Sequence, residues 1–248
     1  MEFYLNGEKM GEDDRKAYRF RWKDAVDGTH YWVAKAIDDT GTSAFSTNVV
    51  VHVNTKTKIK PWDSADVGSP GIPGHTQLGE SPGELTVKSA GDIGGTKDSF
   101  HFAYQKHTGD MEIIAKVESI TPTNEGAEAG VMFRESLTED APFVSLVVPY
   151  IRTGKRGVTL SRAAEGGEVS VIQPEEEFQL PYWIKLVREG DQFTSMISAD
   201  GSTWTTVGIV NVDLPERVYV GLVADAAEVN NATEKYNTSV FSNVQFLK

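Results

Sequence analysis

Side chains suited to binding sugars alternate with aromatic residues along one predicted strand. His101 and Gln105 alternate there with Phe100, Phe102 and Tyr104. Successive side chains of a β-strand point to opposite faces, so the rings share one face and the polar groups share the other. We expect the aromatic face to pack into a core and the polar face to hydrogen-bond the hydroxyl groups of a glycan. The alternative for His101 is an ordinary half-exposed histidine without a ligand.

A second pair of candidates, Arg134 and Glu135, ends an apolar segment. In strand geometry Arg134 shares a face with Met132, whereas Glu135 shares a face with Phe133. A guanidinium in such a segment needs a partner or a wet surface, because burying an unpaired charge is costly. Its planar donors can bridge two sugar hydroxyls or one carboxylate. The sequence therefore leaves open either glycan binding or an internal ion pair of Arg134 with Glu135 or another acid.

Aromatic and basic residues around position 150 extend this set of candidates. Tyr150 ends an apolar run, and its ring can stack on a pyranose. Arg152 and Arg162 follow in the sequence and could line the same surface, although all three side chains also suit plain solvent exposure. Trp183 and Trp204 are further stacking candidates, but their places beside an apolar run and an Asp-Gly turn favour packing in the core or against the turn.

Carboxylates in two loops could hold a structural calcium ion. Asp92 and Asp98 enclose a glycine-rich loop, and Asp63 and Asp66 lie in another. Oxygen ligands of this kind suit Ca²⁺, but the spacing of an EF-hand loop is absent. The histidines do not occur at a spacing typical of metal sites, and the chain has no cysteine, which excludes thiolate metal sites and thiol nucleophiles. Calcium is therefore the one candidate cofactor.

Residue patterns typical of catalysis do not occur in the sequence. A Glu-x-Asp-x-Glu segment, which would place several acids on one face of a strand, is missing. The acidic run 175–177 is contiguous, so its side chains would point to alternating faces. GxSxG, HExxH and a phosphate-binding glycine loop followed by a helix are missing too. We expect no catalytic residue; the alternative is a glycan-cleaving enzyme that uses a carboxylate such as Glu135.

The elements that must position these residues are short β-strands. Segments rich in Val, Ile, Phe, Tyr and Thr are separated by Gly, Asp, Asn and Pro, which predicts an all-β fold. Residues 1–54 hold too few segments for a complete sandwich, and the polar segment 55–61 is predicted to be a linker. The number of segments in residues 62–248 predicts one large two-sheet sandwich, with a tight hairpin at 199–202. The predicted strands are 3–5, 18–22, 31–36, 48–53, 84–89, 99–105, 111–120, 130–136, 143–150, 157–162, 168–172, 182–188, 192–198, 203–210, 218–223 and 238–247.

Composition narrows the classes of partner. The chain has 248 residues, of which 39% are hydrophobic, enough for one large or two modest cores. Its formal net charge is −12, and a broadly acidic surface repels nucleic-acid phosphates and anionic membranes. We therefore expect neither nucleic acid nor membrane as a partner.

Residues 3–53 contain the stretches FYLNGEKMGED and AYRFRWKDAVDGTHYWVAKAIDDTGTSAFSTNVVVHV. On these stretches the segment resembles the C-terminal part of a bacterial immunoglobulin-like module that serves as a spacer in secreted and cell-surface carbohydrate-active enzymes. The first strands of that family are missing, so the resemblance implies a partial immunoglobulin-like domain over 1–54. It also implies a fragment of a longer chain.

Residues 62–246 contain five stretches in order: WDSADVGSPGIPG, GDIGGTKDSFHFAYQKHTGDMEIIAKV, AGVMFRESL, PYWIKLVREGDQFTSMISADGSTWTTVG and VYVGLVADA. On these stretches the segment resembles a family of concanavalin-like β-sandwich domains of unknown function, which are appended to bacterial glycoside hydrolases and lyases. The resemblance implies a lectin-like two-sheet sandwich over 62–248 with a role in glycan recognition, and it implies no catalytic activity.

The leading prediction is a non-catalytic carbohydrate-binding accessory module of a secreted bacterial polysaccharide-degrading enzyme. Its partners would be a polysaccharide or oligosaccharide and a catalytic domain in the same parent chain, and its location would be extracellular, either secreted or at the cell surface. Two alternatives remain: a structural or protein-interaction spacer without glycan binding, and a glycan-cleaving enzyme. The predicted glycan-binding residues are His101, Gln105, Arg134, Glu135, Tyr150 and Arg162.

Overall fold

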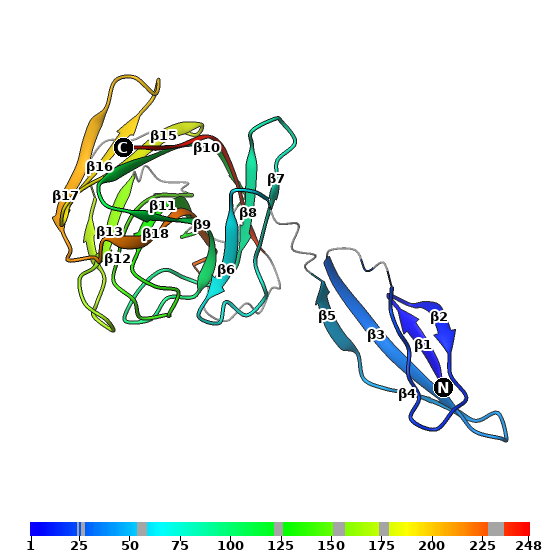
Figure 1. The fold of residues 1–248 in the computed structure, drawn as a ribbon. Helices are drawn as coiled ribbons and strands as arrows, with labels where there is room; N and C mark the ends of the chain where they lie inside the picture. The colour runs from blue at the N-terminus through cyan, green and yellow to red at the C-terminus, as the bar shows by residue number, and fades with distance from the viewer. Residues whose placement is uncertain are drawn as a thin grey trace. The chain divides into compact units, whose positions relative to one another are not determined.

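The computed structural model describes residues 1–23, 25, 28–53, 59–121, 126–150, 157–173, 179–227 and 236–248. Every regular element in these ranges is a β-strand. The described residues contain no helix that is long and apolar enough to cross a membrane. The chain divides into two compact units, Met1–Thr57 and Lys58–Lys248, here called unit 1 and unit 2 (Figure 1). The division falls inside the predicted linker 55–61, and the all-β prediction is confirmed.

Unit 1 is a single antiparallel sheet of five strands in the order β2-β1-β3-β4, with β5 also paired to β3. Asn6-Gly7 forms the β1–β2 turn with φ of 50° and 89°, as a tight hairpin requires. The strands are β1 (Glu2–Leu5), β2 (Glu8–Glu12), β3 (Gly28–Ile37), β4 (Ser43–Phe45) and β5 (Val49–Val53).

One predicted strand of unit 1 is wrong. Residues 18–22 are not a strand, because Ala17 and Tyr18 have φ of 97° and 25°, outside the range of extended backbone. The carboxylate of Asp13 holds this turn by accepting hydrogen bonds from the backbone N–H groups of Arg15 at 3.0 Å and Arg19 at 2.8 Å. Local hydrogen bonding therefore replaces the sheet pairing that the aromatic residues predicted.

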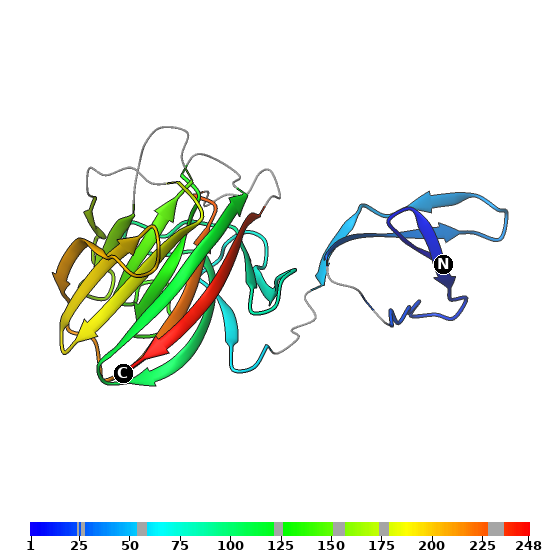
Figure 2. The same ribbon diagram turned by 90° about the horizontal axis from the view of Figure 1, so that it is seen from above.

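Unit 2 consists of two seven-stranded antiparallel sheets. Sheet I has the order β17-β16-β15-β10-β19-β8-β7, and sheet II has the order β14-β13-β12-β11-β18-β9-β6. The C-terminal strand β19 lies beside β10 in the middle of sheet I (Figure 2). The strands are β6 (Asp63–Val67), β7 (His75–Leu78), β8 (Leu85–Ser89), β9 (Phe100–Thr108), β10 (Met111–Thr121), β11 (Glu128–Arg134), β12 (Phe143–Pro149), β13 (Val158–Arg162), β14 (Ser170–Ile172), β15 (Tyr182–Glu189), β16 (Gln192–Ser198), β17 (Thr205–Asn211), β18 (Arg217–Asp225) and β19 (Asn237–Leu247).

The predicted strands of unit 2 are all present, and the predicted hairpin joins β16 to β17. The sequence missed β6 and β7, which are polar and lie at the edges of sheets II and I. Edge strands bury less side-chain surface than central strands, so they need less of the apolar alternation that reveals a strand in a sequence.

The main core fills the space between the sheets. In β10 the buried residues Met111, Ile113 and Ala115 alternate with half-buried ones, as one inward face requires. Opposite them lie Val131 and Leu146 of sheet II. This face-to-face packing of two sheets is the concanavalin-like sandwich that the sequence predicted.

Sheet II is also buried on its outer face. A second apolar cluster there contains Phe100, Phe102 and Met132, which are fully buried, together with the loop residues Ile93 and Leu137. The strands β11 and β12 are consequently buried on both faces. Loop residues cover the part of the outer face of sheet II around this cluster, whereas Tyr104 and Tyr219 on the same face are half-buried.

Candidate functional site

Two of the predicted glycan-binding residues lie in a buried ion cluster. Arg134 and Arg162 are both 0% exposed and share the carboxylate of Asp98. Nη1 of each guanidinium lies 2.6 Å from Oδ2 of Asp98, and Nη2 of Arg162 lies 2.9 Å from Oδ1. The ion pair left open for Arg134 therefore exists, but its acid is Asp98 and not Glu135.

Backbone carbonyls accept the remaining guanidinium hydrogens of this cluster. Nε of Arg134 donates to the carbonyl of Ser136 at 2.9 Å, and Arg162 donates to the carbonyls of Gly167 and Gly95 at 2.9 Å. Burial lowers the pKa of Arg134, and the charge of Asp98 opposes that effect. The prediction that Arg134 and Arg162 bind a glycan is corrected, because their donors are used to tie three loops to sheet II.

His101 is likewise buried, at 2% exposed. Its Nδ1 lies 2.7 Å from Oδ1 of Asp66, and its Nε2 lies 3.2 Å from Oγ1 of Thr76. The aromatic face of β9 packs into a core as predicted, since Phe100 and Phe102 are fully buried in the second cluster. The predicted exposure of the polar face is wrong, because His101 lies on the face of Ala103, toward sheet I. A glycan on the outer face of sheet II would not contact His101.

The remaining predicted residues do not meet. Glu135 is exposed just beyond the end of β11. Tyr150 is half-buried, donates its N–H to the carbonyl of Ala127 at 2.6 Å and packs against the main core. Arg152 and the acidic run 175–177 lie outside the described residues. Of the six predicted residues, Gln105 lines a groove at the edge of the sandwich.

Two of the four carboxylates that the sequence offered for calcium are engaged in other ways. Asp98 binds two arginines, and Asp66 accepts from His101 and from the N–H of Gly74 at 3.0 Å. Within the ranges that the structure describes, no three His, Asp or Glu side chains are grouped to hold a metal ion. Asp63 and Asp66, which the sequence analysis placed in a loop, lie in strand β6.

A different acidic group lies at the start of β11 and the end of β18. Glu128 and Asp225 are cross-strand partners, and Asp225 is 1% exposed. Burial raises the pKa of Asp225 well above its ordinary value, and the charges of Glu128 and Asp92 raise it further. The amide of Asn237 donates to the backbone carbonyls of Glu128 at 2.8 Å and Asp225 at 2.6 Å. Asn237 thus fastens this end of sheet II to β19.

Trp183 and Trp204 are both partly buried near the β16–β17 hairpin. The ring of Trp183, on β15, covers Gly201, where an added Cβ would lie 2.8 Å from Cε2 of the indole. This agrees with the predicted packing of Trp183 against the turn. The ring of Trp204 lies instead beside β15, with its centre 4.4 Å from Nζ of Lys185.

A groove of about 410 Å³ opens at the edge of the sandwich, between β9 of sheet II and the strands β8 and β19 of sheet I. We call it the edge groove. Two aromatic rings lie at its wall, with the centres of Trp62 and Phe246 5.5 Å apart. Its lining residues are Ile59, Lys60, Pro61, Trp62, Leu78, Gly83, Glu84, Leu85, Gln105, Val244 and Phe246.

Polar groups stand among the apolar walls of the edge groove. The half-buried amide of Gln105 and carboxylate of Glu84 line it, and the exposed Lys60 lies at its rim. The ring of His107 stacks on that of Phe246, with centres 4.6 Å apart and an interplanar angle of 18°, and so supports it. Aromatic walls with a few hydrogen-bonding groups are the usual composition of small-ligand sites.

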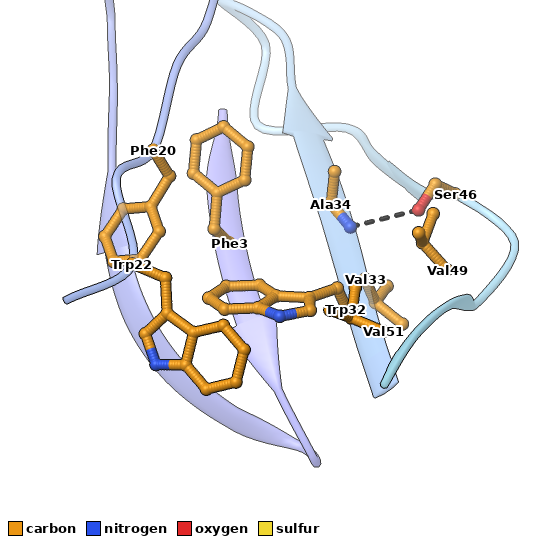
Figure 3. Close-up of a pocket in the computed structure, with 9 residues that line it drawn as sticks. All are labelled: Phe3, Phe20, Trp22, Trp32, Val33, Ala34, Ser46, Val49 and Val51. Carbon is orange, nitrogen blue, oxygen red and sulfur yellow. Dashed lines mark hydrogen bonds between the residues drawn. The ribbon is translucent and has the colours of Figure 1, made fainter. Parts of the chain in front are cut away.

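Unit 1 has a second groove, of about 320 Å³, on one face of its sheet (Figure 3). The rings of Phe3, Phe20, Trp22 and Trp32 gather along it, with neighbouring centres 5.4 to 5.6 Å apart. Its one polar side chain, Ser46, accepts a hydrogen bond from the N–H of Ala34 at 3.0 Å. This groove offers apolar contact and little hydrogen bonding.

No family model matches the chain, and no curated protein matches it. Solved structures do match in fold. A functionally unknown protein from Saccharomyces cerevisiae is 15% identical, with a TM-score of 0.57, and the match covers 70% of this chain and 95% of that one.

Two further structures are larger proteins. A xylan beta-1,4-xylosidase from Bacillus halodurans C-125 is 11% identical with a TM-score of 0.52, and the match covers 89% of this chain and 50% of that one. A GH43B protein of a Bacteroides ovatus xyloglucan PUL is 15% identical with a TM-score of 0.51, and the match covers 89% and 52%. This chain spans about half the length of these two proteins, and the likeness establishes a shared β-sandwich fold.

Proposed function

We propose that this chain is a non-catalytic carbohydrate-binding module of a secreted bacterial polysaccharide-degrading enzyme, and that the edge groove is its binding site. The observation that carries the proposal is the half-buried ring of Phe246, which packs on the buried Trp62, together with the side-chain amide of Gln105 in one groove. Sugar rings present apolar C–H faces and hydroxyl edges, so they match a wall of this mixed character. Two proteins of similar fold carry names that refer to xylan and xyloglucan.

The covered part of the outer face of sheet II favours the edge groove over that surface. Arg134 and Arg162, the two buried guanidinium groups on that face, are occupied by Asp98 and by carbonyls. Gln105 lies on the opposite face of β9 and lines the groove. A ligand can reach its amide without displacing a buried charge.

The proposal is tested by isothermal titration calorimetry with a panel of oligosaccharides. Gln105→Ala is expected to weaken binding roughly 3- to 10-fold, the effect of about one hydrogen bond. Gln192→Ala is the matched control, because Gln192 is exposed in β16 and does not line the groove. Absence of binding across the panel, or equal weakening by both substitutions, would overturn the assignment.

A second candidate function is a protein-interaction module, and the apolar groove of unit 1 favours it. The nine residues that line this groove carry no charge, so an identical face on a second copy of the chain could cover it without burying an ion. Val49 and Val50 are adjacent, 57% and 41% exposed, and point to opposite faces of β5. Sedimentation equilibrium should show self-association that Val49→Asp abolishes and Val50→Asp retains; a monomer at all concentrations would reject this function.

A further inference from the structure

The two charged side chains that line the edge groove, Glu84 and Lys60, differ in burial and in how far their positions are fixed. Among its lining residues, Glu84 supplies the one carboxylate and Lys60 the one ammonium group. Lys60 is exposed on a flexible side chain, whereas Glu84 is half-buried. A charge in a half-buried site is screened less by water and salt than a charge at the rim, so Glu84 acts more strongly on a bound ligand.

Glu84 is fixed by its own loop. Its Oε2 accepts the N–H of Ser81 at 2.9 Å, and its backbone pairs with Gly79 and Ser81 at 2.9 and 3.1 Å. Gly79 packs against the side chain so closely that an added Cβ would lie 2.4 Å from Cβ of Glu84. These contacts use Oε2 and hold the carboxylate at the groove.

A fixed carboxylate distinguishes ligands by charge. A sugar hydroxyl can donate to it, and hydrogen bonds to an ionised acceptor are stronger than neutral ones. The carboxylate of a uronic acid has no proton to donate at neutral pH and is repelled. Glu80, exposed in the same loop, and the net charge of −12 add to this repulsion.

We propose that Glu84 makes the edge groove selective for neutral glycans over glycans that contain uronic acids. This inference rests on the proposed function, because it assumes that the edge groove binds sugars. It adds a substrate class, which follows from the position of one carboxylate beside Trp62, Phe246 and Gln105.

The test measures binding of neutral hexasaccharides (xylohexaose, cellohexaose and mannohexaose) and of hexagalacturonate by titration calorimetry at roughly 20 and 300 mM salt. The wild-type chain should bind at least one neutral probe roughly tenfold or more tightly than hexagalacturonate at low salt, and the ratio should shrink at high salt. Glu84→Gln keeps an acceptor for Ser81 and should reduce the ratio roughly fivefold. Lys60→Gln should increase the ratio, because it removes the attractive charge.

Glu80→Gln is the matched control, since it removes the same charge from the same loop outside the groove lining, and its effect on the ratio should be smaller than that of Glu84→Gln. If sugars bind but hexagalacturonate binds as tightly as the neutral probes, or Glu84→Gln leaves the ratio unchanged, the selectivity is refuted and the binding function stands. If no probe binds, the proposed function fails and the selectivity fails with it.

Discussion

Removing the charge of Asp98 should destabilise unit 2 far more than removing the charge of an exposed carboxylate. Asp98 is 1% exposed and accepts charge-assisted hydrogen bonds from Arg134 at 2.6 Å and from Arg162 at 2.6 and 2.9 Å. The substitution Asp98→Asn keeps the shape of the side chain but leaves two buried guanidinium groups without a counter-charge. The two cations then face each other in a site from which water is excluded.

The expected magnitude follows from this burial. Breaking a buried pair by removing one partner costs about 3–5 kcal/mol, because the remaining charge stays desolvated. In a domain of this size 1 kcal/mol shifts Tm by about 2–4 °C, so Asp98→Asn should lower Tm by roughly 6–20 °C. In Asp98→Asn the carbonyls of Ser136 and Gly167 still accept hydrogen bonds from the two guanidinium groups. The loss of unfolding free energy should therefore stay within about 3–5 kcal/mol and not exceed it.

Urea denaturation and a thermal melt followed by far-ultraviolet circular dichroism measure this loss. Glu139→Gln is the control, because it breaks an ion pair with Lys97 whose side chains are 39% and 67% exposed, and such pairs contribute less than about 1 kcal/mol. If Asp98→Asn and Glu139→Gln destabilise equally, by less than about 1 kcal/mol, the cluster is not held by charge and the reasoning is refuted. Replacing Arg134, Asp98 and Arg162 together by apolar residues should restore much of the loss, since no unpaired charge remains.

Two further substitutions test other parts of unit 2. Asp225→Asn should raise stability at pH 7. The pKa of Asp225 is raised in the folded state, so the folded protein binds the proton more tightly than the unfolded chain does. The stability of the wild-type protein therefore falls as pH rises from the ordinary pKa of 3.8 through the raised pKa of the folded state. The gain should disappear below pH about 4 in urea denaturation, and a variant that is less stable at both pH values would contradict the burial and the repulsion by Glu128 and Asp92. Gly201→Ala should cost about 1–2 kcal/mol or more, because Gly201 has φ of 74° and the new Cβ would press on Trp183; an unchanged melting temperature would show that the hairpin relaxes.

The strands of unit 2 could be predicted because central strands need an apolar inward face. In β10 the alternation of Met111, Ile113 and Ala115 with half-buried residues gives both the element and its orientation. In β9 the same alternation gave the element but not the orientation, since both faces are buried. Phe102 belongs to the outer cluster and Ala103 to the main core, so both faces of β9 are packed against apolar side chains.

The partners of the candidate residues could not be predicted, because they come from distant parts of the chain. Arg134 is 36 residues from Asp98, and Arg162 is 64 residues from it. The edge groove similarly joins Trp62 to Phe246 across almost the whole of unit 2. A single sequence carries the type and spacing of these residues but not the pairing of strands that brings them together, and that pairing depends on the two-sheet topology.

The ion pairs of Asp98 with Arg134 and Arg162 help to explain why the six predicted residues do not form one site. A sheet face can bind an extended glycan only while its polar groups are accessible to solvent. On sheet II the guanidinium groups of Arg134 and Arg162 are buried and paired with Asp98, so they are not accessible. The side of β9 that faces sheet I still opens to solvent at the sandwich edge, where Gln105 lies beside an aromatic wall. Because these two regions lie on opposite faces of sheet II, the charge cluster stabilises the fold without competing for the proposed ligand. Glycan affinity and the stability supplied by Asp98 should therefore change independently in variants that remain folded.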